Sequence, residues 1–212
     1  MISMIRKLAL AALPLFLSSC EVLSSKDSAV LIKGYVLGYE EDKISQATYD
    51  EISASFANVK IGRGKSSTVV LAYVKGDIYE WRSADDVTIY TEKGIISKIT
   101  GLKSDVTFSA FNILDDSLHG VEFESFVSFS DPMLYRSIAL NTIIKTERQV
   151  ILSSLTGPIT TTLFTHDFSV PKIRWSGRNN YYVDGDGVIV KTEQDIHPFL
   201  PRMIIKYYFK FD

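Results

Sequence analysis

The residue with the most specific chemical context in this sequence is Cys20. It directly follows Leu17, Ser18 and Ser19, and it ends an N-terminal segment that has two basic residues near its start and an apolar run over 8–17. This order is typical of a bacterial lipoprotein signal peptide that ends in a lipobox. Small side chains at Ser18 and Ser19 let the backbone enter a signal peptidase, and the Cys20 thiol can carry a thioether-linked diacylglycerol.

The lipobox separates a signal peptide that is removed from the part of the chain that remains after processing. We expect 1–19 to be the signal peptide, 20–28 a lipidated tether and 29–212 a single β-rich periplasmic domain. The apolar run is about half the roughly twenty residues that a membrane-spanning helix needs. Acyl chains on Cys20, palmitate among them, would anchor the product, and Glu21 in the next position favours the outer membrane, periplasmic face. An ordinary secreted protein with a free cysteine is the alternative.

Composition excludes several other classes. Removal of the signal takes away Arg6 and Lys7, which leaves 21 basic and 25 acidic residues, so net charge favours neither nucleic acid nor another polyanion. No second cysteine remains to form a disulfide or a thiolate metal site. We therefore expect no cofactor other than the covalent lipid on Cys20.

Carboxylate pairs are the residues most suited to catalysis, because a glycosidase uses two carboxylates across a sugar. The pairs are Asp85-Asp86, Asp115-Asp116 and Glu122/Glu124. The first two fall in turn-like sequence and the third on the polar face of an alternating strand. Solvated surface explains all three, and we predict no catalytic residue.

Metal and cofactor motifs are weak. Asp184-Gly185-Asp186-Gly187 is similar to the start of a calcium loop, but a third acidic ligand is absent and Asp-Gly favours a hairpin turn. His119, His166 and His197 lack the paired spacing of a zinc site. No phosphate loop, dinucleotide fingerprint or nucleophile elbow occurs, so we predict no metal site.

Aromatic and arginine side chains offer a different chemistry, because rings stack on sugar faces and guanidinium groups pair with uronates or phosphates. Tryptophans on strands also fill cores, and Tyr181 and Tyr182 must point to opposite faces of a regular strand. The candidates for glycan or partner contact are Trp81, Trp175, Arg174, Arg178, Tyr181 and Tyr182.

The elements that would position these side chains are mostly strands. A short helix is predicted near 43–57, with Ser45 as its N-cap and Tyr49, Ile52 and Phe56 on one stripe. Two hairpins follow, over 69–81 and 87–99, and residues 121–129 alternate apolar and polar side chains. Further β-prone stretches are 137–146, 149–155, 159–168, 181–183, 188–191 and 203–209.

Strands this close together leave no room for crossover helices. The fold class predicted is therefore all-β, an antiparallel meander that closes into a barrel-like or sandwich body. Trp81 and Trp175 each precede a β-hairpin at nearly equal distance, so two similar halves related by duplication are one way to build it.

Several segments give a more specific comparison. In the N-terminal half they are ANVKIG (57–62), WRSAD (81–85) and GIISKITGL (94–102), and in the C-terminal half NYYVD (180–184), Gly187, VKTEQ (190–194), Pro198 and Pro201. Together they resemble the YjbF/GfcB family, the group 4 capsule polysaccharide lipoproteins. The resemblance spans the chain, although 103–150 is similar only in character. The family usually has Arg after the glycine matching Gly94, and Trp where this chain has Tyr182.

The resemblance implies an outer-membrane lipoprotein of exopolysaccharide or capsule secretion, with a β-barrel-like fold and no established enzyme activity. We therefore expect a non-enzymatic accessory factor whose partners are polysaccharide or polysaccharide-export proteins. Two alternatives stay open: a polysaccharide-modifying hydrolase that uses an acidic pair, and a structural envelope lipoprotein that docks on an outer-membrane complex through a sheet edge or the 121–129 face.

Overall fold

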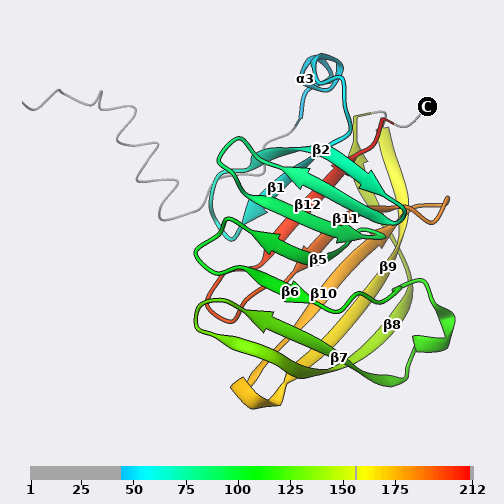
Figure 1. Ribbon diagram of the computed structural model, residues 1–212. Helices are drawn as coiled ribbons and strands as arrows, with labels where there is room; N and C mark the ends of the chain where they lie inside the picture. The colour runs from blue at the N-terminus through cyan, green and yellow to red at the C-terminus, as the bar shows by residue number, and fades with distance from the viewer. Residues whose placement is uncertain (1–43, 156, 211–212) are drawn as a thin grey trace, which may run out of the picture. The chain divides into compact units, whose positions relative to one another are not determined.

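The described chain is a sheet that closes on itself (Figure 1). The computed structural model describes residues 44–155 and 157–210. Neighbouring strands pair antiparallel in sequence order, and the last strand returns to the first, so the predicted all-β antiparallel barrel is confirmed. The elements are α3 (Gln46–Glu51), β1 (Phe56–Ile61), β2 (Ser67–Lys75), β3 (Ile78–Arg82), β4 (Thr88–Glu92), β5 (Ile95–Thr100), β6 (Val106–Phe108), η2 (Asp116–Leu118), β7 (Glu122–Phe129), β8 (Leu134–Ser154), β9 (Gly157–Val170), η3 (Pro171–Ile173), β10 (Trp175–Val183), β11 (Ile189–Gln194) and β12 (Met203–Tyr208).

Strand β1 closes the barrel because it is paired on both sides. Phe56 lies opposite Tyr208 of β12 and also opposite Val70 of β2. Along β12, Met203, Ile205 and Tyr207 are buried while the residues between them are partly exposed. A single wall therefore separates an apolar interior from the outside, and the period of two along each strand decides which side chains face in.

The two early hairpins form where the sequence places them. Lys75 pairs with Ile78, and Glu92 pairs with Ile95, so both turns have two residues. In the second turn Lys93 and Gly94 both have positive φ, 49° and 79°, as a type I′ turn requires. A Cβ on Gly94 would lie 2.7 Å from the Cβ of Ile189, so both the backbone conformation and the packing favour glycine there.

Strand β8 is longer than the sequence suggests. The β-prone stretches over 137–146 and 149–155 belong to one strand, Leu134–Ser154. Its pairing with β9 shifts register between Thr146 and Gln149, so an irregularity in the ladder accounts for the break in the sequence pattern. In Figure 1, β8 and β9 run together along one side of the barrel up to its upper end.

The predicted helix forms, but it is shorter than the 43–57 range. Ser45 is its N-cap and accepts a hydrogen bond from the Thr48 backbone N–H at 3.1 Å. The helix ends at Glu51, and Phe56 begins β1. Phe56 continues the helical stripe of Tyr49 and Ile52, but it also fits the alternation of a strand, and pairing with β2 and β12 decides between the two.

The two ends of the barrel differ. Connections 62–66, 83–87, 101–105, 130–133, 171–174 and 195–202 lie at one end, which we call the closed end. There the last connection packs inward, with Ile196 and His197 buried and the His197 ring 4.7 Å from that of Phe129. The opposite end, which we call the open end, carries α3, the end of β12 and the alternate set of turns.

Candidate functional site

A hollow of about 730 Å³ occupies the open end. Its walls come from α3, the start of β3, the β4–β5 and β10–β11 turns, the 109–121 connection, the β8–β9 hairpin and the end of β12. This volume is within the range of roughly 300–1,000 Å³ typical of small-molecule sites. The lining includes Gln46, Tyr49, Tyr79, Lys93, Asn112, Ile159, Asp184, Ile189, Tyr207 and Phe209.

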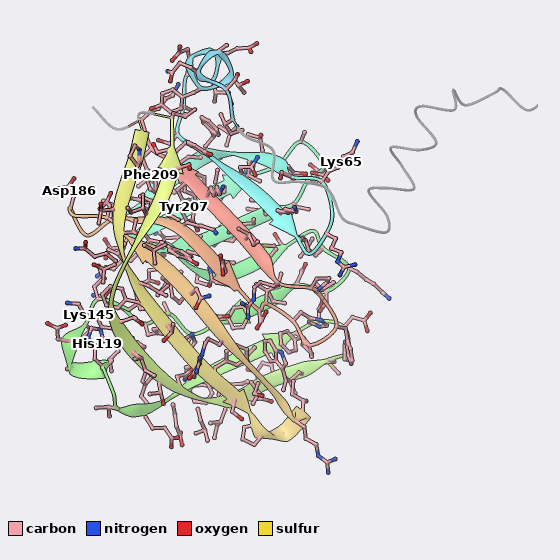
Figure 2. The ribbon with its side chains drawn as sticks, turned by 180° about the vertical axis from the view of Figure 1, so that it is seen from behind. Lys65, His119, Lys145, Asp186, Tyr207 and Phe209 are labelled. Carbon is pink, nitrogen blue, oxygen red and sulfur yellow. The ribbon has the colours of Figure 1, made fainter. Side chains whose placement is uncertain are left out.

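Aromatic rings form one wall of the hollow. Tyr207 and Phe209, two positions apart at the end of β12, are labelled in Figure 2. Their ring centroids are 5.7 Å apart and the ring planes are nearly parallel. Tyr79 meets Phe209 edge to face at 6.1 Å. Behind them Trp81 contacts Tyr207 at 5.3 Å. Contacts of this kind hold the rings in fixed orientations, so a bound molecule would meet a preformed apolar surface.

Polar groups surround this wall. The ammonium of Lys93 lies 3.4 Å from Asp77 Oδ2. Asp184 Oδ1 accepts hydrogen bonds from the backbone N–H groups of Asp186 and Val188, which fixes the β10–β11 turn. Asn112 Oδ1 accepts from the Leu114 backbone N–H. Rings beside charged and amide groups suit a ligand that has both apolar faces and hydrogen-bonding groups.

The six residues proposed for glycan or partner contact do not gather at one place. Trp81 is 1% exposed and its indole Nε1–H donates to Thr91 Oγ1 at 2.9 Å, as expected of a core residue that supports the hollow from behind. Trp175 lies toward the closed end, where its ring meets that of Phe168 edge to face at 4.6 Å. Arg174 is exposed and follows η3 in the left-handed conformation.

Tyr181 and Tyr182 point to opposite faces of β10, as predicted. Tyr181 is fully buried, and its hydroxyl donates to Gln194 Oε1 at 3.2 Å. Tyr182 lies on the outer face and donates to Glu193 Oε1 at 3.1 Å. Burial and the neighbouring Glu193 raise the pKa of Tyr182 to about 12. Nearby, Arg178 makes a bidentate pair with Asp167 at 2.6 and 2.7 Å.

None of the carboxylate pairs lines the hollow. Asp85 and Asp86 are exposed in the β3–β4 connection, and a hydrogen bond with Ser83 holds the pKa of Asp85 below its usual value. Asp115 caps η2 by accepting from the Ser117 backbone N–H at 3.0 Å. Glu122 and Glu124 are both exposed on β7, which confirms the predicted polar face of that strand.

The Asp184–Gly187 segment forms the β10–β11 turn, as its Asp-Gly pairs predict. Within 44–155 and 157–210, no three His, Cys, Asp or Glu side chains are placed to hold a metal ion. In the same part of the chain, no helix is long and apolar enough to cross a membrane. Leu17, Ser18, Ser19 and Cys20 lie outside the described residues.

The interior also contains a polar cluster. His166 lies between two asparagines, with Nε2 2.9 Å from Asn141 Oδ1 and Nδ1 3.3 Å from Asn179 Nδ2. Burial lowers the pKa of His166 to about 4. A small cavity of about 40 Å³ lies beside these side chains, which is room for a few water molecules at most. We assign the cluster a role in the core.

Sequence reasoning missed the residues of the hollow itself. Tyr79 and Phe209 carry no motif, and they are 130 positions apart in the chain. The alternation of β12 does predict that Tyr207 and Phe209 share a face, and this is the one sequence signal that points to the hollow. That β3 and the β10–β11 turn meet the same face depends on barrel closure.

Comparison with known proteins gives the following. The family profile described as "Group 4 capsule polysaccharide lipoprotein gfcB, YjbF" matches residues 29–207. The crystal structure of the hypothetical lipoprotein YmcC from Escherichia coli K12 has a TM-score of 0.66 and 16% identity, covering 87% of this chain and 96% of that chain. A candidate lipoprotein of Parabacteroides distasonis ATCC 8503 covers 74% of this chain and 94% of its own at 9% identity and a TM-score of 0.36. No curated protein matches. The YmcC likeness shows a shared fold.

Proposed function

Because the chain belongs to the YjbF family of group 4 capsule polysaccharide lipoproteins, we propose that it is a non-enzymatic accessory factor of capsule or exopolysaccharide secretion. In this proposal the barrel binds a segment of the polysaccharide in the hollow at its open end. A preformed site would bind the polysaccharide without a large conformational change.

One observation carries this proposal: the hollow of about 730 Å³ with its wall of Tyr79, Tyr207 and Phe209. Tyr79 and Phe209 are partly exposed while Tyr207 is almost fully buried. The two outer rings can therefore contact a sugar face, and Tyr207 supports them. Lys93 at the edge, which pairs with Asp77, can donate further hydrogen bonds to sugar hydroxyls.

The anchoring part of the proposal rests on the sequence. We propose that Cys20 is acylated after cleavage of 1–19 and that the lipid holds the barrel to the periplasmic face of the outer membrane. Labelling cells with a fatty-acid analogue should mark the wild-type protein and leave Cys20→Ser unmarked. A mature protein that starts at another residue would remove this part of the proposal.

Glycan binding is tested with the purified chain from residue 20, carrying Cys20→Ser, on immobilised capsular polysaccharide of the same organism. We expect the double variant Tyr79→Ala/Phe209→Ala to weaken binding about tenfold or more, the usual effect of truncating two central aromatic contacts. The matched control is Tyr73→Ala/Tyr135→Ala, because both tyrosines are exposed outside the hollow, by 60% and 80%. Equal binding by all three proteins would place the glycan elsewhere, and no binding by any of them would contradict direct glycan contact.

Deletion of the gene tests the accessory role itself. Surface or secreted polysaccharide should fall under conditions in which the capsule genes are expressed, and wild-type protein should restore it. The hydrolase alternative predicts new reducing ends when the purified chain is incubated with the polymer. The accessory factor predicts none, so the two functions give opposite results in that assay.

A further inference from the structure

The three most exposed large hydrophobic side chains among the described residues lie at the closed end of the barrel. They are Met133, Tyr135 and Phe199, exposed by 87%, 80% and 75%. Met133 ends the β7–β8 connection, Tyr135 is the second residue of β8, and Phe199 lies in the 195–202 connection. We call these three side chains the apolar tip. Exposed hydrophobic groups that gather at one end of a molecule mark a contact surface.

The two connections that carry the tip are held together by packing. The His197 ring lies 4.7 Å from the ring of Phe129 and 5.7 Å from that of Phe199. Leu134, between Met133 and Tyr135, is buried and pairs with Phe129. The tip is therefore part of the folded body, and displaying it costs little conformational entropy.

A β-bulge places Arg136 beside Tyr135 on the outer face. Between the pairs Phe129↔Leu134 and Val127↔Ser137, strand β8 has one residue more than β7. Within this bulge Arg136 has a φ of 39°, and its backbone N–H donates to Ser128 Oγ at 3.0 Å. Bulges at barrel rims re-aim side chains, and here the result is two consecutive exposed residues, Tyr135 and Arg136.

Cations surround the tip. Lys103, Arg136, Lys172 and Arg174 are all exposed on the connections next to it. Asp105 and Asp131 are the carboxylates in the same region, and a further pair, Arg202 with Asp195, neutralises itself at 2.8 Å. The remaining connections of this end carry Arg63 and Lys65 and, in equal number, Asp85 and Asp86. The connections of the closed end together with Arg136 therefore carry a net positive charge.

From this arrangement we propose that the apolar tip inserts into the head-group region of a phospholipid bilayer that carries anionic lipids. Aromatic and methionine side chains among cations are typical of surfaces that lie in a membrane interface. Because the tip lies at the closed end, a membrane bound there leaves the hollow at the opposite, open end of the barrel.

Vesicle flotation tests this proposal with the chain from residue 20 carrying Cys20→Ser, so that no acyl chain contributes. Vesicles of phosphatidylcholine with phosphatidylglycerol should carry the protein. The variant Met133→Ser/Tyr135→Ser/Phe199→Ser should lose about tenfold or more of its partitioning, because three exposed apolar groups no longer enter the interface. Pure phosphatidylcholine, or added salt, should also reduce binding.

The matched control is Tyr73→Ser/Val121→Ser/Ile151→Ser, which removes hydrophobic side chains exposed by 60%, 52% and 70% at other places. This control should float like the parent protein. Equal loss in both triple variants would show binding without a defined tip and would overturn the proposal. So would the absence of flotation in the parent protein, and the tip would then be a protein-binding surface.

Discussion

At the scale of single residues, hydrogen bonding determines the state of His166. Asn141 Nδ2 donates to the Phe123 and Ala139 carbonyls, so its Oδ1 is the atom that faces the His166 ring. Asn179 Oδ1 accepts from the Asp195 backbone N–H, so its Nδ2 faces Nδ1. His166 is therefore neutral with its proton on Nε2, and a second proton on Nδ1 would meet a donor in a buried site.

This arrangement predicts a pH dependence of stability. His166 has a pKa of about 4 in the folded barrel and 6.5 in an unfolded chain, so between these values the unfolded state binds more protons. The contribution of His166 to the free energy of unfolding is fully present above pH 6.5. It falls by about 3 kcal/mol as the pH drops to 4, at 1.36 kcal/mol per pH unit. Urea unfolding at pH 7 and pH 4.5 measures the difference.

The control is His166→Gln, which is compared by slope because its stability at pH 7 can differ. Its free energy of unfolding should vary less between the two pH values. Burial also lowers the pKa of His197, so a smaller dependence in the same direction should remain. An unchanged slope in His166→Gln would assign the effect to other groups.

At the scale of elements, α3 is held by the end of the chain. The helix has six residues and none of them is buried, and a helix this short is unstable alone. Lys210 Nζ donates to the carbonyls of Tyr49 and Ile52 and lies 4.1 Å from the centre of the Tyr49 ring. The Lys210 backbone N–H also donates to Ser55 Oγ. A residue that follows β12 thus supplies the missing partners at the C-terminus of α3.

The substitution Lys210→Met tests this dependence while keeping side-chain length. It removes hydrogen bonds from a charged donor, which contribute roughly 1.5–3 kcal/mol, so backbone amides of 46–52 should exchange with solvent about tenfold faster or more. The melting temperature of the barrel should change little. Lys75→Met, at an exposed lysine in the β2–β3 hairpin, is the control. Loss of protection throughout the barrel would mean that α3 belongs to the cooperative core.

Elements with local signals are the ones that the sequence predicts. Lys93-Gly94 and Asp184-Gly185 are turn sequences, and the alternation of β7 shows its polar face. Strand β1 has no such signal, because Asn58 is buried on it despite being polar and its pairing with β12 joins residues about 150 positions apart. The hollow is harder still to predict from the sequence, because its lining comes from separate segments that meet only when the barrel closes.

At the scale of the whole molecule, closure limits the surfaces at which the protein can bind partners. Although the sheet closes, β8 beyond Ile143 pairs only with β9, and β9 before Thr162 pairs only with β8, so this hairpin keeps a free edge on each side. The two predicted docking surfaces, a sheet edge and the outer face of β7, therefore both stay predictions. Other surfaces at which partners can bind are the hollow, the outer faces of the strands and the connections at each end.

Closure also predicts that a destabilising substitution in the β1–β12 pair, which we call the seam, lowers the stability of the whole barrel. Ile205 of β12 is 1% exposed and pairs with Val59 of β1. Replacing it with alanine should lower the free energy of unfolding by about 2–5 kcal/mol. We expect the closed barrel to open as one unit, so the slowest amides of β7 and β8 across the barrel should lose protection by the same amount in hydrogen exchange.

The control is Ile204→Ala, which truncates the partly exposed neighbour on the outer face and should cost less. If Ile205→Ala weakened protection only in β1 and β12, the seam would open on its own and the barrel would behave as two or more independent parts.

The position of β1 gives the barrel a mechanical property. A pull on the chain from its N-terminal side passes α3 and then reaches β1, which is bonded to β2 on one side and to β12 on the other. Such a load runs along the strand and strains both ladders in shear, so many hydrogen bonds resist together. Under such a load the barrel should keep its shape at forces that peel an edge strand away bond by bond.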